Sequence, residues 1–484
     1  MIFIKSLLLL FSVSVVASCS LLAPTPTAQN VRPDQLTFAS LEFQIPKIEQ
    51  VQLANGIRVY LLEDAELPLV EVTAMIGAGA ISDPVEKDGR SGLFAALLQD
   101  GGAGERDPVA FEEYLESLAI DFGAGTGSYM TTIGLSMLQE DVNKGITILD
   151  DVLRRPRFDS SRLELHRKQT LEGLRRRDDN PGSVAGRALN RAIYADHPFG
   201  RAATVESVTA VTRDDLIAFH RKHFVPDNLW LAISGDFDRQ SMLSNLEQVF
   251  GDWQPVGHHA QPLPMLRQSL EPAVWVAEKD IPQTTIRLGH IGVSKDNPDL
   301  HAIRVMNFIL GGGGFNSRLL REIRSNRGLA YSVYSYFPVG RKLPGAFIAG
   351  SETKCASTGE VVGLMLDEMK RIRTEPVSAE ELALAKESRI NSFVFAFTNS
   401  HQILTQQVRL DYFNYPEDYM QSYRQKVAAV TREDIQRVAQ KYLQPEKLAI
   451  VLVGRSSEFD AVPESFGLPV RKIPLESAKN GKKE

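Results

Sequence analysis

The chain has 484 residues, of which 43% are hydrophobic and 24% charged, and its formal net charge is −6. This is ordinary globular composition, so most of the chain is expected to fold, and its length predicts more than one domain. No basic stretch is long enough to form a face, so the charge pattern gives no support to a nucleic-acid partner.

Residues 1–18 predict a secretory signal peptide. Lys5 precedes an apolar run, Leu7 to Val16, that is too short for an ordinary membrane span. The end of this segment, Val16-Ala17-Ser18-Cys19, resembles a bacterial lipobox, which predicts that the mature chain begins at a lipidated Cys19. Ser20 follows, in place of the aspartate that typically retains lipoproteins at the inner membrane. We therefore expect an outer-membrane lipoprotein that faces the periplasm of a Gram-negative bacterium; the alternative is an ordinary signal cleaved nearby, with Cys19 incidental.

The mature chain is expected to start with a proline-rich tether, residues 19–42. Cys355 is the only cysteine besides Cys19. With Cys19 lipidated, Cys355 has no partner within the chain, so the sequence predicts neither a disulfide framework nor a cysteine-based zinc site.

Two segments of the chain repeat each other. The sequence VTRDDLIAFHRKHFVPDNLWLAISGDFD begins at Val211, and VTREDIQRVAQKYLQPEKLAIVLVGRSS begins at Val430, an offset of 219 residues without gaps. Each predicts a helix capped by threonine, ended by proline and followed by a buried strand. The same offset aligns FDSSRLELHRK from Phe158 with VSAEELALAKE from Val377. The chain is therefore predicted to be a tandem duplication of a unit of about 200 residues.

Apolar runs beginning at Val70, Thr131, Thr284 and Gly345 predict strands, and longer segments of helical period lie between them. Strand pairs that alternate with helix pairs predict an α+β fold with mainly antiparallel sheets. Four prolines and few apolar residues mark a linker between the repeats. The expected organisation is a signal peptide (1–18), a tether (19–42), a first domain (43–253), a linker (254–273), a second homologous domain (274–456) and a C-terminal tail (457–484).

The segment LGGGGFNSRLLREIRSNRGLAYSV, Leu310 to Val333, contains a run of four glycines. It is not a phosphate loop, because no lysine follows the glycines, and the preceding HAIRVMNFIL has a helical period where a dinucleotide fingerprint needs a strand. From the residues alone, a flexible turn between two helices remains open.

This segment closely resembles the second homologous domain of the pitrilysin/insulinase family of zinc metallopeptidases, which includes mitochondrial processing peptidase. The resemblance spans about Phe43 to Gly454 and includes DPVEKDGRSGLFAALLQDGG, NPGSVAGRALNRAIYADHPFGR and the repeated VT units. It implies two homologous α/β-sandwich domains with mainly antiparallel sheets, together forming half of a clamshell. It also implies that Gly311, Gly312, Gly313, Gly314 and Phe315 form a mobile, substrate-binding rim of the substrate chamber.

The family's catalytic element is His-x-x-Glu-His on a first-domain helix, where two histidines one turn apart bind zinc and the glutamate activates water. The matching helix here, Gly89 to Gly102, contains no histidine and no glutamate. In the preferred register the histidine positions hold Gly92 and Ala96 and the glutamate position holds Ala95; the other register gives Ala95, Leu98 and Gln99. We therefore expect no metal site in this chain.

Two other places contain residue types that can bind a metal. Glu172 lies near the spacing of the family's third zinc ligand, but one carboxylate cannot hold zinc, and a solvated helix residue is the favoured interpretation. His220 and His223 are three residues apart, yet the repeat has Ala439 and Tyr442 at these positions, which favours a structural role.

The other half of the family's site is an arginine and a tyrosine seven residues apart, and Arg324 and Tyr331 have this spacing. The resemblance implies that they contact substrate backbone and that the tyrosine hydroxyl stabilises the oxyanion. Arg327, four residues before Tyr331, is the alternative arginine. A surface arginine and a half-buried tyrosine without function are the structural alternative.

The resemblance thus implies a zinc-free subunit that is inactive alone and joins a zinc-bearing homologous partner around an extended peptide. Family members also bind peptides along an exposed strand edge, expected here in GTGSYMTTIGLSML from Gly125. The alternatives are an inactive peptide-binding or scaffold protein of the same fold and an autonomous zinc protease with an unusual site.

Overall fold

A computed structural model describes residues 45–257, 262–266, 271–395, 397 and 399–475. The predicted signal peptide, the tether and Cys19 lie outside these residues. By compactness, Ile45–Glu484 forms a single unit. None of the helices within the described ranges is both long enough and apolar enough to span a bilayer.

The first half contains a six-stranded sheet in the order β1-β2-β6-β3-β5-β4. The strands are β1 (Glu49–Gln52), β2 (Arg58–Glu63), β3 (Leu69–Ile76), β4 (Asp121–Thr126), β5 (Thr131–Leu138) and β6 (Leu229–Gly235). Neighbouring strands are antiparallel except β2 and β6, which are parallel.

The second half repeats this sheet in the order β12-β7-β11-β8-β10-β9. Its strands are β7 (Ala273–Glu278), β8 (Gln283–Ile291), β9 (Ala330–Tyr336), β10 (Ala346–Lys354), β11 (Ala449–Gly454) and β12 (Val470–Lys472). The parallel pair recurs as β7 and β11. The halves differ at one edge, because β12 is parallel to β7 whereas β1 is antiparallel to β2.

The helices keep the register of the repeat. The first half has α2 (Arg90–Asp100), α3 (Pro108–Ser117), α4 (Val142–Arg154), α5 (Ser160–Arg175), α6 (Pro181–Tyr194), α7 (Val205–Thr209), α8 (Arg213–His223) and α9 (Arg239–Phe250). The second has α10 (Leu300–Asn307), α11 (Arg318–Leu320), α12 (Thr358–Thr374), α13 (Ala379–Val394), α14 (Ser400–Tyr412), α15 (Tyr419–Ala428) and α16 (Arg432–Tyr442). Helices α8 and α16 both begin after a capping box, formed by Thr212 with Asp215 and by Thr431 with Asp434. The predicted duplication and the α+β fold are confirmed.

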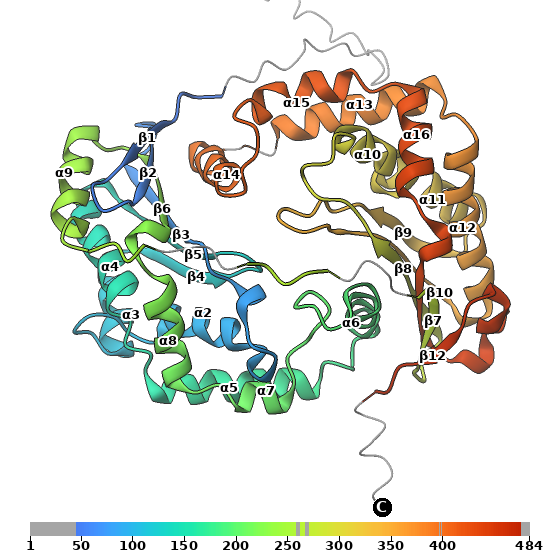
Figure 1. Ribbon diagram of the computed structural model, residues 1–484, viewed down its shortest axis with the longest axis horizontal. Coiled ribbons are helices and arrows are strands. Elements are labelled where there is room, and N and C mark those ends of the chain that lie inside the picture. Colours follow the sequence, from blue (N-terminus) through green and yellow to red (C-terminus); the bar gives the residue numbers. More distant parts are fainter. Residues whose placement is uncertain (1–44, 258–261, 267–270, 396, 398, 476–484) are drawn as a thin grey trace, which may run out of the picture. The chain divides into compact units, whose positions relative to one another are not determined.

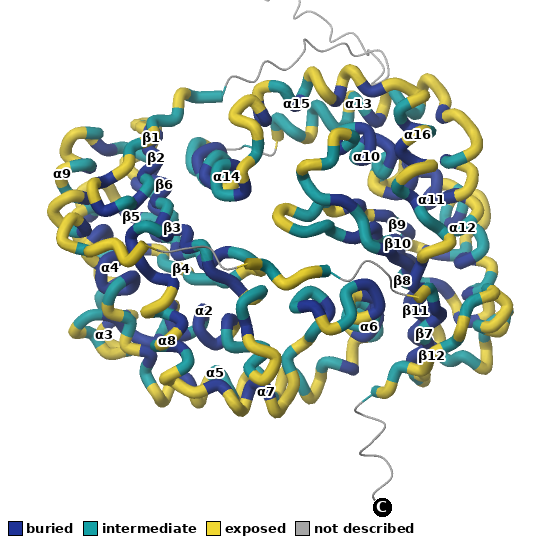
Figure 2. The backbone as a smooth tube through the Cα atoms, in the orientation of Figure 1, coloured by how far each residue is buried: buried dark blue, intermediate teal, exposed yellow. Residues whose placement is uncertain are grey.

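Each sheet packs one face against helices of its own half. On β6, Leu231 and Ile233 join the first core with α2, α4, α8 and α9, while Ala232 between them faces the opposite side. This alternation follows from the two-residue period of a strand. Figure 2 shows the buried residues concentrated on the strands and on the inner sides of the helices.

The two halves exchange one helix each across the opposite faces. Helix α14, from the second half, contributes Leu404 and Val408 to a cluster with Tyr60 and Ala232 of the first sheet. Helix α6, from the first half, packs residues including Leu189 against Val451 and its neighbours on β11 (Figure 1). The exchanged helices occupy equivalent positions in the repeat, which the sequence did not reveal as an exchange.

A partly buried histidine holds α14 on the first sheet. His401 Nε2 lies 2.8 Å from Thr73 Oγ1 on β3, and His401 Nδ1 lies 2.8 Å from Ser234 Oγ on β6. Burial lowers the pKa of His401 to about 4. The ring is therefore neutral at physiological pH, when it can satisfy both hydroxyl groups.

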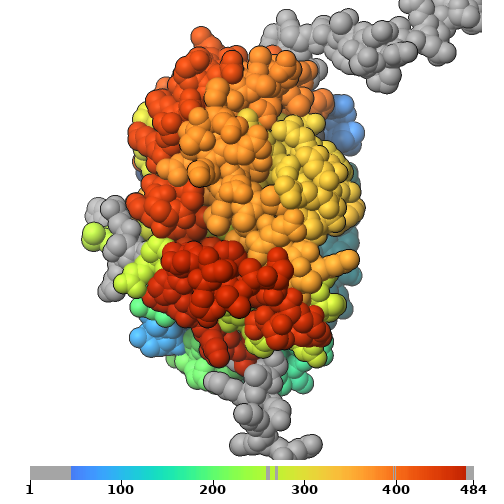
Figure 3. All heavy atoms as spheres, turned by 90° about the vertical axis from the view of Figure 1, so that its right-hand side faces the viewer, coloured from blue at the N-terminus to red at the C-terminus, as the bar shows by residue number. Residues whose placement is uncertain are grey.

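Two predicted boundaries need correction. Part of the predicted C-terminal tail is folded, because β12 pairs with β7 in the second sheet. Ahead of β12, Asp460 accepts hydrogen bonds from the backbone N–H groups of Gly359 and Glu360 at the start of α12. In Figure 3 the C-terminal residues (red) form a large part of the surface of this half. The predicted linker also ends one residue late, since β7 begins at Ala273.

Candidate functional site

Helix α2 carries the positions where the family has its zinc motif. Its inner side is fixed by Phe94, whose ring contacts the rings of Phe158, Phe219 and Phe224 at centroid distances of 5.4, 4.8 and 5.2 Å. Gly92 is exposed, and Ala95 and Ala96 bring no metal-binding atom. The alternative register fares no better, because Leu98 is buried in the core. The residues of α2 therefore do not fit a zinc ion.

The other residues considered for a metal have structural partners. Glu172 is exposed on α5 and forms ion pairs with Arg175 and Arg176. His220 Nε2 lies 2.9 Å from the backbone oxygen of Leu153, and burial lowers the pKa of His220. No group of three or more His, Cys, Asp or Glu side chains in the described part of the chain is arranged to hold a metal ion.

The glycine-rich segment is more ordered in its local structure than a flexible turn. Helix α10 continues through a π-helical turn, Phe308–Gly312, and a short 3₁₀ turn, Gly314–Asn316, follows. Gly311 is buried, and a Cβ atom there would lie 2.5 Å from the backbone nitrogen of Ser335 on β9. Gly314 has a φ of +58°, a conformation that favours glycine.

This arrangement corrects part of the rim prediction. Gly311 lies below the surface, where the absence of a side chain lets the helix approach β9. Gly312, Gly314 and Phe315 are exposed and Gly313 is partly so. For these four residues, contact with a peptide stays a prediction.

Three predicted site residues come together at the end of this segment. The Arg324 guanidinium lies between two aromatic rings, 4.7 Å from the ring centre of Phe315 and 4.3 Å from that of Tyr331. Phe315 is 68% exposed and Tyr331 is 80% exposed, so the stack lies at the surface. Such cation–π contacts orient the guanidinium without using its N–H donors.

Arg324 and the alternative, Arg327, differ in their interaction partners. Arg327 forms ion pairs with Glu322 and Glu360 at 2.7 and 3.3 Å. Within the described ranges, the guanidinium of Arg324 has no ion pair with a carboxylate. Arg324 is therefore the arginine whose hydrogen-bond donors are available to a ligand.

A buried ion pair fixes the chain just before Arg324. Arg318 donates two hydrogen bonds to Glu381 at the start of α13, at 2.8 and 2.7 Å. Burial alone raises the pKa of Glu381, but the hydrogen bonds from Arg318 outweigh it and lower the pKa to about 2. The bidentate geometry holds the turn that leads to Arg324 in a defined position.

The strand edges differ from the prediction. Strand β5 lies between β3 and β4, so it is not an edge. The edge strand is β4, and of the predicted stretch only Gly125 and Thr126 belong to it. In the second sheet the equivalent edge strand is β9, which carries Tyr331.

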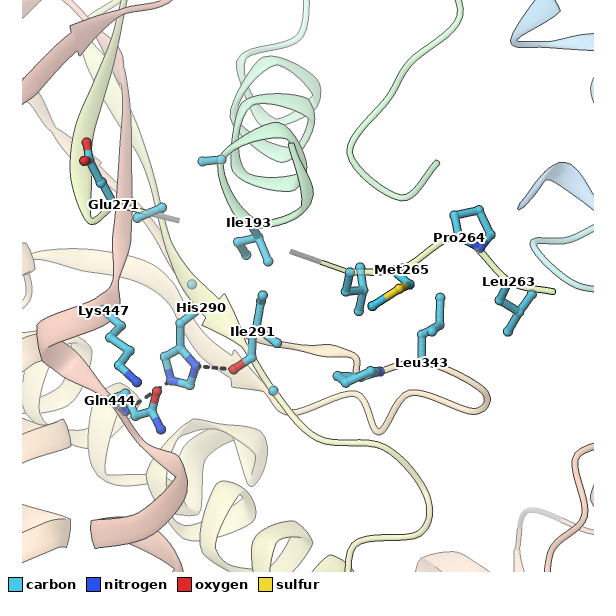
Figure 4. A pocket seen from close by; sticks show the side chains of 16 residues that line it. Ile193, Leu263, Pro264, Met265, Glu271, His290, Ile291, Leu343, Gln444 and Lys447 are labelled. Atoms are coloured by element: carbon cyan, nitrogen blue, oxygen red, sulfur yellow. Dashed lines mark hydrogen bonds between the residues drawn. The ribbon is translucent and has the colours of Figure 1, made fainter. Parts of the chain in front are cut away.

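A cavity of about 500 Å³ lies between the end of α6, β8 and the segment 263–266. Figure 4 shows His290 on β8 at its wall, with both ring nitrogens occupied. His290 Nδ1 lies 2.8 Å from the backbone oxygen of Ile291, and Nε2 accepts a hydrogen bond from the backbone N–H of Gln444 at 3.3 Å. His290 therefore has a structural role at the wall of this cavity.

Comparisons with known proteins agree with this geometry. The family model described as Insulinase (Peptidase family M16) matches residues 58–205, and the model described as Peptidase M16 inactive domain matches residues 210–389. The crystal structure of a peptidase M16 inactive domain from Pseudomonas fluorescens superimposes with a TM-score of 0.76 at 27% identity, covering 84% of this chain and 98% of that chain.

Two relatives represent different members of the family. The non-peptidase homolog YmxG of Helicobacter pylori is 27% identical over 390 residues, 80% of this chain and 88% of the relative. The β subunit of the mitochondrial-processing peptidase of Saccharomyces cerevisiae is 24% identical over 457 residues, 89% of this chain and 96% of the relative. With one family model matching each half of the chain and the same sheet topology in both halves, the chain belongs to the insulinase family, peptidase family M16.

Proposed function

We propose that the chain is the zinc-free subunit of a two-chain peptidase. A homologous partner with the His-x-x-Glu-His motif supplies the metal site, and this chain supplies groups that bind the peptide and stabilise the transition state. The observation that carries this proposal is the exposed stack of Phe315, Arg324 and Tyr331. Among the described residues, the Arg324 guanidinium has no ion pair with a carboxylate.

The chemistry of the stack suits an oxyanion. A phenolic O–H is a neutral donor, so Tyr331 can donate a hydrogen bond to a developing alkoxide, while Arg324 can donate to a peptide carbonyl. Glu381 and Arg318 fix the preceding turn, which places these donors before the peptide arrives. Donors that need no reorganisation contribute most to lowering a barrier.

The residues of α2 support dependence on a partner, because Gly92, Ala95 and Ala96 offer neither a ligand nor a general base. The name of the yeast relative, a subunit, states that this relative functions in an assembly. The edge strand β9 places Tyr331 where an extended peptide can add main-chain hydrogen bonds.

The test is reconstitution with a zinc-bearing homologue and an extended peptide. The isolated chain should not cleave the peptide, and the two-chain complex should. Tyr331→Phe should lower kcat by about 100-fold or more, the typical effect of removing one oxyanion donor, with assembly unchanged by size-exclusion chromatography.

Arg327→Ala is the matched control, because it removes an arginine three residues from Arg324 that is already paired with Glu322 and Glu360. It should change kcat by less than about twofold, in keeping with an exposed ion pair. Cleavage at an unaltered rate by both the Arg324→Ala and the Tyr331→Phe complexes would refute the catalytic role.

A peptide-binding protein without hydrolysis is the second candidate, favoured by the name of the Helicobacter relative, a non-peptidase homolog. It predicts that adding this chain to a zinc-bearing homologue does not raise the rate of peptide cleavage. Peptide binding by the isolated chain would then remain.

We also propose that the chain is anchored to the outer membrane through a lipid on Cys19 and faces the periplasm. The support is the apolar run Leu7 to Val16 followed by small residues and Cys19. In a Gram-negative host, Cys19→Ala should move the protein from the membrane fraction to the soluble fraction. Cys355→Ser is the control, since Cys355 is buried beside Thr284; loss of membrane association in both variants, or in neither, would oppose lipidation at Cys19.

A further inference from the structure

A cavity of about 490 Å³ in the second half is lined by three arginines from three different helices. Arg304 comes from α10, Arg389 from α13 and Arg409 from α14, and Tyr419 and Tyr423 of α15 complete the polar wall. The whole chain carries a net charge of −6, so this concentration of positive charge is local.

Two of the three arginines of this cavity are held by neutral groups. Arg304 Nη1 donates to the hydroxyl of Tyr419 at 2.7 Å, and Arg389 Nη2 donates to the hydroxyl of Tyr423 at 3.0 Å. Within the described part of the chain, none of the three guanidinium groups forms an ion pair with a carboxylate. The Nε atom of Arg389 is buried and has no hydrogen-bond partner among these residues.

Carboxylates on neighbouring segments are engaged elsewhere. Asp418, at the start of α15, pairs with Lys426 at 3.7 Å. Asp411, two residues after Arg409, accepts hydrogen bonds from Gln50 and Tyr60 of the first half. These contacts provide no counterion for the cavity.

Two ionisable groups at the cavity have lowered pKa values, and nearby positive charge contributes to both. His301, which packs against Tyr419 and Tyr423, has its pKa lowered to about 4, first by burial and then by repulsion from Arg304, Lys426 and Arg389. Burial, and then the charge of Arg341, lowers the pKa of Arg409.

Uncompensated charges in a partly buried cavity are costly, because each loses solvation and repels the others. An anion that enters removes both penalties at once. Guanidinium groups match carboxylates with two parallel hydrogen bonds, and Phe393 and Phe397 give the same cavity an apolar wall.

The cavity adjoins the candidate site through two helices. Helix α10 runs from Arg304 directly into the glycine-rich turn, and α13 carries both Arg389 and the Glu381 that fixes Arg318. Arg409 also lines a second cavity of about 420 Å³ with Arg341. A ligand can therefore meet cationic groups in two neighbouring cavities.

We propose that the cavity lined by Arg304, Arg389 and Arg409 binds a carboxylate of the peptide, so that the substrate class is acidic peptides. This inference rests on the proposed function only in taking the ligand to be a peptide. The carboxylate comes from an acidic side chain or from the peptide C-terminus, and both sources offer the same chemistry to the guanidinium groups.

The test measures binding of labelled peptides to the isolated full chain by fluorescence anisotropy at fixed ionic strength. One pair of peptides differs only by Glu→Gln, with amidated ends, and a second pair differs only by a free or amidated C-terminus. In at least one pair, the form with the extra carboxylate should bind about tenfold tighter or more; equal binding within both pairs overturns the proposal without any variant.

Arg389→Gln and Arg409→Gln should each abolish most of this difference, with the thermal midpoint recorded to show that the variant is folded. Arg221→Gln on α8 is the matched control, an exposed arginine of the first half whose loss changes the net charge equally; it should leave the difference intact. If the folded cavity variants keep the difference, the site is wrong. If inorganic phosphate displaces the acidic peptide at equal concentration, the cavity is a site for free anions and the peptide assignment fails.

These measurements need neither partner nor zinc. If the catalytic role proposed for this chain fails, the measured carboxylate preference is therefore unaffected. If the carboxylate preference fails, the result of the reconstitution is likewise unaffected.

Discussion

Helix α2 in the first half and helix α10 in the second occupy the same place in the repeated topology. Each follows the fourth strand in the order of its sheet, β3 or β8, and precedes the edge strand, β4 or β9. Helix α2 exposes Gly92, whereas α10 continues into a π-helical turn that leads to Phe315, Arg324 and Tyr331. The comparison teaches that a duplicated fold can keep its packing in both copies while only one copy has the stack of Phe315, Arg324 and Tyr331 at its surface.

The largest expected effect concerns the packing of α2. Phe94→Ala should lower the free energy of unfolding by about 3–5 kcal/mol, because it removes a fully buried ring from a cluster of aromatic side chains. Urea denaturation measures it, with Gln99→Ala on the exposed side of α2 as a control expected within about 0.5 kcal/mol. Equal effects of the two changes would mean that α2 is not held through its core side.

The exchanged helices α6 and α14 occupy equivalent positions in the two halves, but their side chains differ. His401 on α14 has Gly182 as its counterpart on α6. The pKa of His401 is lowered to about 4 in the folded chain, below the ordinary value of about 6.5. The neutral form therefore contributes stability above pH 6.5, which is lost as the pH falls from about 6.5 to about 4.

The expected loss over this range is on the order of 3 kcal/mol, from a shift of about two and a half pKa units. The free energy of unfolding measured between pH 7 and pH 4 tests it. His401→Gln should flatten this part of the profile, and an unchanged slope in the variant would assign the pH dependence to other groups such as His301.

Two glycines test the difference between the helices directly. Gly311→Ala should lower the free energy of unfolding by about 1–3 kcal/mol, since its methyl group would collide with the backbone of Ser335. Gly92→Ala should raise it by about 0.5–1 kcal/mol, because the exposed α2 position has no atom near the added Cβ and alanine favours a helix. Thermal unfolding distinguishes the two signs, and effects of the same sign would contradict the close approach of the glycine-rich turn to β9.

The smallest expected effect separates function from folding at Tyr331. The side chain is 80% exposed, so Tyr331→Phe in the isolated chain should change the free energy of unfolding by less than about 0.5 kcal/mol. A large loss of stability would mean that the hydroxyl has a structural partner, and the kinetic effect proposed for this change could then no longer be interpreted as lost transition-state stabilisation.

Much of the fold could be predicted because its signals are local. Thr212 and Thr431 cap helices at the predicted positions, and the apolar runs at Thr131 and Thr284 form β5 and β8. The strand edge was predicted only in part, at Gly125 and Thr126, because an apolar run does not reveal which strand lies beside it. Strand β5 is apolar in alternate positions yet is paired on both sides.

The candidate site was predictable in its residues but not in its geometry. The spacing of Arg324 and Tyr331 pointed to a pair, but the ion pairs that engage Arg327 involve Glu322 and Glu360, and the second of these is far along the chain. The arginine cavity gave no signal at all. Arg304, Arg389 and Arg409 are isolated in the sequence and meet only because α10, α13 and α14 pack around one space.

The sequence by itself determined the duplication, the alternation of strands and helices, and the absence of the His-x-x-Glu-His motif from α2, since all three depend on residue type and short-range order. The tertiary structure alone decided the exchange of α6 and α14, the burial of Gly311 against β9, the stack around Arg324 and the cavity of three arginines. These features depend on contacts between segments that are distant in the chain. The energy of each contact depends on residues from both segments, and a local sequence pattern contains only one of them.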